Sequence, residues 1–304
     1  MSDHASGYGV VVAVDGSTES DAATRWAGRE AEMRGSPITL MHVVVPVVVS
    51  WPVGSLQGSF SQWQEDNAHD VIGQAQRVLL SEFDVSELPA VHTEVRHGND
   101  VAELTDASGK AQMIVVGSRG MGAIGGAVLG SVSTGLLHHA QCPVAVVHAN
   151  EAFAADSTSP VLLGIDGSPA SEAATALAFD EAARRGVDLV ALHAWSDVGV
   201  LPALGMDWKE HEDEGREVLG ERLAGWHEQY PDVHAERRIV CDQPAHWLIE
   251  ESQRAQLVVV GSHGRGGFKG MLLGSVSSAV ARHAKCPVLV VRDRGNEGAN
   301  YDFD

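Results

Sequence analysis

The sequence Gly117-Ser118-Arg119-Gly120, followed after nine residues by Gly130-Ser131-Val132-Ser133, occurs twice in the chain. The second copy is Gly261-Ser262-His263-Gly264 followed by Gly274-Ser275-Val276-Ser277, with the same spacing. Each copy follows a short apolar run and precedes a segment of helical character. Glycine lets the backbone approach an anion closely, and the unpaired N–H groups of a helix start point toward it. The pattern therefore predicts a phosphate-binding loop between a strand and a helix in each half of the chain.

The repeat extends well beyond this motif. Asp166-Gly167-Ser168 repeats Asp15-Gly16-Ser17 at the end of a first apolar run, and the sequence 283–288 repeats 139–144. The copies are 151 residues apart at their starts and 144 apart from the glycine motif onward, so the second copy is shorter by seven residues. We therefore expect two domains, 7–148 and 160–292, joined by a linker at 149–159 and followed by a disordered tail at 293–304.

Strand and helix patterns alternate within each copy. In the first copy we expect strands at 9–14, 37–45, 91–96, 113–116 and 143–147, helices at 19–34, 61–82 and 131–140, a short helix from Asn99 to Ser108, and an irregular loop at 46–60. Such alternation predicts an α/β fold of parallel βαβ units with helices on both faces of a five-stranded sheet. In the strand order 3-2-1-4-5 the first and fourth strands are neighbours, so Asp15 and Gly117 would face one crevice, as would Asp166 and Gly261.

Composition excludes several classes of protein. The chain has 304 residues, 44% of them hydrophobic, which suits two ordinary globular domains. Its formal net charge of −20 argues against nucleic acid and against an anionic membrane surface as partners. Three cysteines without disulfide or metal-ligand spacing fit a reducing cytoplasm, and we expect no targeting segment and no membrane span.

The residues at these strand ends suit a nucleotide. An aspartate there can accept hydrogen bonds from ribose hydroxyls or an adenine amine, or hold a metal ion through water. Ser131 and Ser133 can donate hydroxyls to phosphate oxygens. Arg119 in the first copy, and Arg265 or Lys269 in the second, could balance charge. The first loop has fewer cations, so the two affinities need not be equal.

Other interpretations of single features are weaker. One glycine-rich loop is often only a turn, but two copies with identical spacing and an Asp-Gly-Ser each favour a binding site. The sequence 120–125 matches the dinucleotide fingerprint G-x-G-x-x-G, but it follows the fourth strand and Lys269 breaks it in the second copy. Neither loop ends in the Gly-Lys-Ser/Thr of a P-loop. We expect His42 and His193 to be core histidines, and Cys142 and Cys286 to be packing residues. Cys241 has no counterpart in the repeat, and we expect it to be inert, with redox sensing as the alternative.

The combined pattern resembles the universal stress proteins. Its parts are G-x-x-G-x₉-G-[ST], an aspartate ending the first strand, and a closing H-A-x-C-P-V-x-V-V, all present in both copies. The chain looks like a tandem member of that family over about residues 7–148 and 160–292. The resemblance implies a Rossmann-like fold in each domain, and one ATP per domain, with Mg²⁺ held only through the ATP. It also implies slow hydrolysis at most, no catalytic residues, and a role in survival under stress, hypoxia or growth arrest.

The resemblance also implies which residues contact ATP. The first set is Ala13, Asp15, Val43, Gly117, Ser118, Arg119, Gly120, Met121, Gly122, Gly130, Ser131, Val132 and Ser133. The second set is Gly164, Asp166, Ala194, Gly261, Ser262, His263, Gly264, Arg265, Gly266, Gly274, Ser275, Val276 and Ser277.

Three functions stay open at this point. The first is an ATP-binding regulator with an unidentified protein partner. The second is an enzyme, either a slow ATPase or a nucleotidyl transferase. The third is an interaction scaffold with vestigial sites. The apolar fifth strands, 144–147 and 288–291, would lie at sheet edges, and uncovered edges invite pairing. We therefore expect the domains, or two chains as a homodimer, to pair through them.

Overall fold

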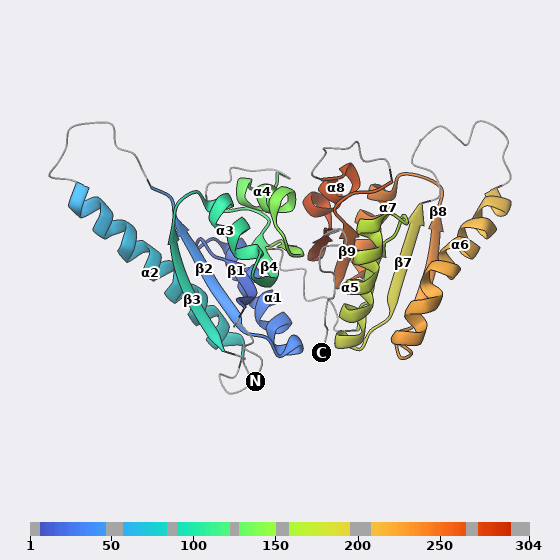
Figure 1. The fold of residues 1–304 in the computed structure, drawn as a ribbon, viewed down its shortest axis with the longest axis horizontal. Coiled ribbons are helices and arrows are strands. Elements are labelled where there is room, and N and C mark those ends of the chain that lie inside the picture. Colours follow the sequence, from blue (N-terminus) through green and yellow to red (C-terminus); the bar gives the residue numbers. More distant parts are fainter. Residues whose placement is uncertain are drawn as a thin grey trace. The chain divides into compact units, whose positions relative to one another are not determined.

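The chain folds into two compact units, Met1–Ala149 and Asn150–Asp304. The computed structural model describes residues 7–46, 57–83, 90–121, 128–149, 158–194, 208–265 and 273–292. The expected linker and tail lie almost entirely outside these residues. Each unit is an α/β domain whose strands are flanked by helices on both faces (Figure 1).

The first unit contains a parallel sheet in the order β3-β2-β1-β4-β5. Helices α1 and α2 pack together, as do α3 and α4, so each pair covers one face. The elements are β1 (Gly9–Ala13), α1 (Thr18–Arg34), β2 (Ile38–Val44), α2 (Gln57–Glu82), β3 (Val91–His97), α3 (Asp100–Ser108), β4 (Ala111–Gly117), α4 (Ser131–His139) and β5 (Val144–Val147).

The second unit repeats this arrangement in the order β8-β7-β6-β9-β10, again with parallel pairs. Its elements are β6 (Val161–Gly164), α5 (Pro169–Arg185), β7 (Leu189–Ala194), α6 (Trp208–Gln229), β8 (Ala235–Val240), α7 (Pro244–Glu251), a 3₁₀ turn (Ser252–Arg254), β9 (Leu257–Gly261), α8 (Ser275–His283) and β10 (Val288–Val291). The predicted fold class and the strand order 3-2-1-4-5 are confirmed in both units.

Burial explains why the central strands are continuous apolar sequences. Val10, Val11 and Val12 of β1 are completely buried, because helices cover both faces of a parallel sheet and each strand must be apolar on both sides. At the end of the sheet, β3 alternates polar and apolar residues and is largely exposed. The interpretation of residues 91–96 as a less buried edge strand is therefore confirmed.

Helix ends follow local side-chain chemistry. Ser17 caps α1 by accepting a hydrogen bond from the Ser20 backbone N–H at 3.1 Å, and Gly35 ends the helix in the left-handed conformation with φ of 58°. Ser168 and Gly186 do the same for α5.

The loop expected at 46–60 is partly wrong, because α2 already begins at Gln57. Gly58 and Ser59 are weak helix formers, which suggested a loop, but helix propensity is a weak preference that a long helix overrides. Residues 47–56 lie outside the described part of the chain.

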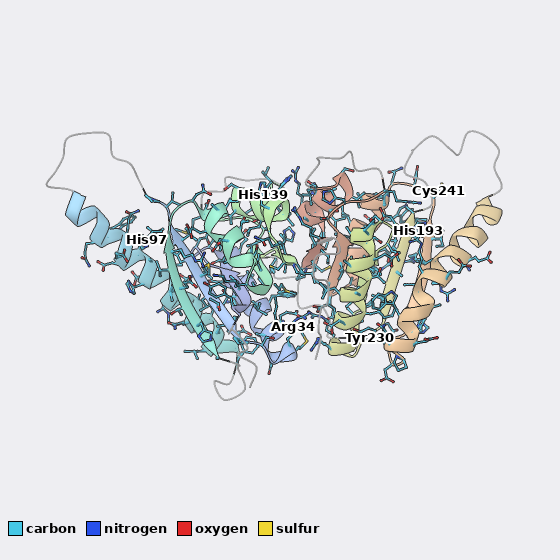
Figure 2. The ribbon with its side chains drawn as sticks, viewed as in Figure 1. Arg34, His97, His139, His193, Tyr230 and Cys241 are labelled. Carbon is cyan, nitrogen blue, oxygen red and sulfur yellow. The ribbon has the colours of Figure 1, made fainter. Side chains whose placement is uncertain are left out.

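The two units fill the same helix–helix contact differently. In the second unit Phe179 of α5 is completely buried, and its ring lies 5.8 Å from the rings of Trp226 on α6 and of Tyr230 just beyond that helix (Figure 2 labels Tyr230). The corresponding position in α1 is Gly28, where an added Cβ would lie 2.5 Å from Cε2 of Phe83. The first helix therefore supplies an aromatic ring to this contact only in the second unit, and in the first unit Phe83, just beyond α2, lies against the glycine of that helix.

This contact gives a test of the core. Phe179→Ala should lower the free energy of unfolding of the second unit by about 3–5 kcal/mol, because it leaves a cavity between α5 and α6. Hydrogen exchange followed by mass spectrometry should show faster exchange in peptides of α5 and α6, with α1 and α2 unchanged as an internal control. The exposed Leu80→Ala should change the free energy by less than about 0.5 kcal/mol. Unchanged exchange in α5 would contradict the assignment.

Candidate functional site

Each unit has a cavity at the carboxyl ends of its two central strands. In the first unit β1 and β4 are neighbours, so Asp15, just beyond β1, lies beside the glycine loop that follows β4. In the second unit β6 and β9 are neighbours and place Asp166 beside the equivalent loop. The cavities have volumes of about 320 Å³ and 620 Å³, both within the range of small-molecule sites.

The aspartates hold the loops in place. The Asp15 carboxylate accepts the Ser17 N–H at 3.0 Å through Oδ1 and the Met121 N–H at 3.1 Å through Oδ2. A Cβ at Gly120 would lie 2.5 Å from the same Oδ2, so this close approach requires glycine. One carboxylate therefore ties the β1–α1 turn to the glycine loop.

The second unit repeats these contacts. Asp166 accepts the Ser168 N–H at 2.9 Å and the Arg265 N–H at 3.0 Å, and a Cβ at Gly264 would lie 2.5 Å from its Oδ2. The aspartates were predicted as possible ligand contacts, and the structure gives them an organising role as well.

The helix starts are tied to the strand ends by serines. Ser133 donates its hydroxyl hydrogen to the Gly117 carbonyl at 2.7 Å, and Ser277 donates to the Gly261 carbonyl at 2.5 Å. Both serines are buried, whereas Ser131 and Ser275 are exposed at the first helical position. Ser131 and Ser275 are therefore the hydroxyls available to donate to a ligand.

The N-termini of α4 and α8 lack the usual cap. Their N-cap residues are Gly130 and Gly274, and within the described residues no side chain accepts a hydrogen bond from the first turn, in contrast to α1 and α5. The N–H groups of a helix start need partners and carry partial positive charge. A phosphate bound in the cavity would satisfy them, so the residues present fit a nucleotide phosphate.

Most of the predicted site residues line the cavities. In the first unit those that do so are Ala13, Asp15, Val43, Gly117, Arg119, Gly120, Met121, Gly130, Ser131, Val132 and Ser133. In the second unit they are Gly164, Asp166, Ala194, Gly261, His263, Gly264, Arg265, Gly274, Ser275, Val276 and Ser277.

Four predicted residues are not among the lining residues. Ser118 and Ser262 are buried, with exposures of 2% and 1%. Gly122 and Gly266 lie outside the described residues.

Several lining residues escaped the sequence reasoning. They are Val14, Ser20, Met41, His42, Asp100, Leu104 and Val116 in the first unit, and Ile165, Ser171, Leu192, Gln243, Pro244, Ala245, His246, Leu248, Val260 and Ala279 in the second. Asp100 and Pro244 begin the helices that follow β3 and β8. The carboxyl ends of those strands lie at the same edge of the sheet, which was the signal available in the sequence.

The second cavity extends between α7 and α8. In the first unit Val101 fills this place, since a Cβ at Gly135 would lie 2.6 Å from its Cγ1. In the second unit the same positions are Ala245 and Ala279, and both line the cavity. The exchange of a valine for an alanine at the helix start opens the space.

The histidines of β2 and β7 are each hydrogen-bonded to a backbone carbonyl. Nδ1 of His42 donates to the Val14 carbonyl and Nδ1 of His193 to the Ile165 carbonyl, both at 2.7 Å. Burial lowers the pKa of His193 below its ordinary value, so the ring is neutral at pH 7. Figure 2 shows His193 near the carboxyl end of β7 and Cys241 just beyond β8. His42 also lines the first cavity, which its interpretation as a core residue did not foresee.

The thiols of Cys142 and Cys286 are packing groups rather than reactive ones. Cys142 and Cys286 are buried, and burial raises the pKa of Cys286 well above its ordinary value, so the reactive thiolate is suppressed. Within the described residues, no group of three or more histidine, cysteine, aspartate or glutamate side chains could hold a metal ion. No helix in that part of the chain is long and apolar enough to cross a bilayer.

The chain matches the sequence profile of the Universal stress protein family over residues 9–148 and 158–292. A universal stress protein of Mycolicibacterium smegmatis is 59% identical over 294 residues, covering 97% of this chain and all of that one. One from Mycobacterium tuberculosis is 49% identical over 286 residues, covering 94% and 97% of the two chains. The crystal structure of a universal stress protein from Archaeoglobus fulgidus superposes with a TM-score of 0.71 at 20% identity, covering 94% and 99%.

The carboxylate anchor gives a second test. Asp15→Asn keeps the size of the side chain but replaces one accepting oxygen by an NH₂ group, so it can accept only one of the two N–H groups. Amide exchange in the peptide that contains Gly120 and Met121 should speed up by about tenfold, because one charge-assisted hydrogen bond is lost. The exposed Asp232→Asn is the control. Unchanged exchange in the loop would show that Asp15 does not hold it.

Proposed function

The chain belongs to the universal stress protein family, and we propose that each of its two domains binds one molecule of ATP. The observation that carries this proposal is the uncapped start of α4 and of α8, facing a cavity that a glycine loop borders. The helix dipole and unpaired N–H groups favour an anion at this point.

The rest of the first cavity suits a nucleoside. Ala13, Met41, Val43 and Leu104 offer apolar surface for a base. Asp15 lines the same cavity, where its carboxylate would accept a hydrogen bond from a ribose hydroxyl. Apolar surface at one end and phosphate-binding N–H groups at the other match the two ends of a nucleotide, and Mg²⁺ would be held through the phosphates.

The contacts of Asp15 suit a site that holds a nucleotide. Its two carboxylate oxygens accept the backbone N–H groups of Ser17 and Met121, so this side chain is engaged in holding the loop in place. We therefore propose a regulator that holds ATP with slow hydrolysis at most, acting through a protein partner in survival of stress, hypoxia or growth arrest. A slow ATPase is the alternative, and turnover lost in Asp15→Ala together with Asp166→Ala would favour it.

Assembly and location belong to the same proposal. The strand β5 pairs with β4 at the end of the sheet of its unit, as β10 pairs with β9 in the other, and the edge of a sheet can attract a further strand. We propose that pairing through these edges makes a homodimer, and that the protein acts in the cytoplasm. The functional domains are proposed at 7–148 and 160–292.

Matched glycine substitutions test the two sites separately. Gly120→Ala should weaken ATP binding by the first domain and Gly264→Ala by the second, since each Cβ would displace the carboxylate that holds the loop. Equilibrium dialysis with labelled Mg-ATP should give about two molecules per chain for the native protein and about one for each variant, with a loss of at least about tenfold in affinity at the altered site.

The control is Gly225→Ala on α6, where an added Cβ meets nothing within 4 Å. It should bind like the native protein. Circular dichroism checks that each variant is folded. Native protein that binds no ATP would overturn the proposal.

A further inference from the structure

The two cavities differ in charge at matched positions. The repeat aligns Asp100 with Pro244 and Met121 with Arg265, and all four residues line a cavity. A carboxylate in the first site is thus replaced by a neutral residue in the second, and a neutral residue by a cation.

The cation of the first cavity is already paired. Arg119 lies 3.2 Å from the Glu19 carboxylate, whose side chain is only 14% exposed. With Arg119 balanced by Glu19, the carboxylates of Asp15 and Asp100 give the first cavity an excess of negative charge. In the second unit Ala170 occupies the position of Glu19 and His263 that of Arg119, so this ion pair is replaced by two different side chains.

In the second cavity the negative charge of Asp166 is balanced by the positive charge of Arg265. Asp166 lines it together with Arg265, whose backbone N–H donates to Asp166 and fixes the residue at the loop. Arg222 lies beside Gly167 and forms an ion pair with Glu172 at 3.0 Å. In the first unit the position of Glu172 is occupied by Asp21, which accepts a hydrogen bond from the neutral side chain of Gln74 at 3.0 Å. Burial lowers the pKa of His193; the positive charges of Arg265 and Arg222 lower this pKa as well, whereas the hydrogen bond to Ile165 and the charge of Asp166 raise it.

The charges that line the two cavities would act on the phosphates of a bound nucleoside triphosphate. A nucleoside triphosphate without a cation carries its full negative charge, and a divalent cation that bridges its phosphates neutralises part of it. Carboxylates near a partly desolvated site repel the cation-free form strongly, because screening by water is reduced there. A cation such as Arg265 in the second cavity offsets this repulsion between the carboxylate and the cation-free triphosphate.

We propose that the first cavity takes a nucleoside triphosphate only as its complex with a divalent cation, whereas the second takes it with or without one. This inference rests on the proposed ATP binding. It assigns Asp100 and Glu19 in the first unit, and Arg265 in the second, as the residues that set the dependence on the cation.

Variants that retain a single binding site allow the Mg²⁺ dependence of the two sites to be compared. Gly264→Ala leaves the first site and Gly120→Ala the second, and each is titrated calorimetrically with ATP at fixed ionic strength, once with Mg²⁺ and once with EDTA. Removing Mg²⁺ should weaken binding at the first site by at least about tenfold and at the second by less than about threefold.

Charge exchange then tests the residues in the native background. Asp100→Asn together with Glu19→Gln should reduce the Mg²⁺ dependence of the first site, and Arg265→Met should raise that of the second. High salt should narrow the gap between the sites, because it screens the exposed charges. Because these charge variants carry no glycine substitution, their titrations test the inference even if a glycine variant fails to fold.

The outcomes separate the two proposals. ATP bound at both sites with equal dependence on Mg²⁺, or with the greater dependence at the second, overturns this inference and leaves ATP binding intact. No ATP bound at either site even with Mg²⁺ overturns both.

Discussion

The carboxylates of Asp15 and Asp166 each join two segments that are far apart in the sequence. Each accepts one N–H from the turn after a first strand and one from the glycine loop after a fourth strand, over 2.9–3.1 Å. The loop glycine must lack a side chain because the carboxylate occupies that space. The open helix start and the cavity beside it depend on this link, so one pair of hydrogen bonds organises each site.

The duplicated domains show which parts of the site are fixed and which vary. The aspartate anchor, the serine that donates to a strand carbonyl and the uncapped helix are the same in both units. The residues around them differ, as in the exchange of Asp100 for Pro244 and of Val101 for Ala245. A tandem chain can therefore keep one arrangement of loop and helix start while its two cavities differ in charge and size.

The sequence predicted the features that depend on local chemistry or on the repeat. The strand order 3-2-1-4-5 placed Asp15 and Gly117 beside one crevice, and Gly35 marked the end of α1. It missed Asp100 and Gln243, because their part in the cavity depends on where the third strand of each sheet lies. It could not show that Ser133 donates to Gly117 rather than pointing outward, since that choice depends on how the helix start packs on the strand.

The most direct test of the account is the nucleotide that the protein carries when it is purified from cells. Heat-denatured protein is separated by ion-exchange chromatography, and the released adenine nucleotide is quantified per chain. The account predicts close to two molecules per chain, mostly ATP, because both cavities hold it and hydrolysis is slow. Protein that releases no nucleotide, and takes up none when Mg-ATP is added, would contradict it.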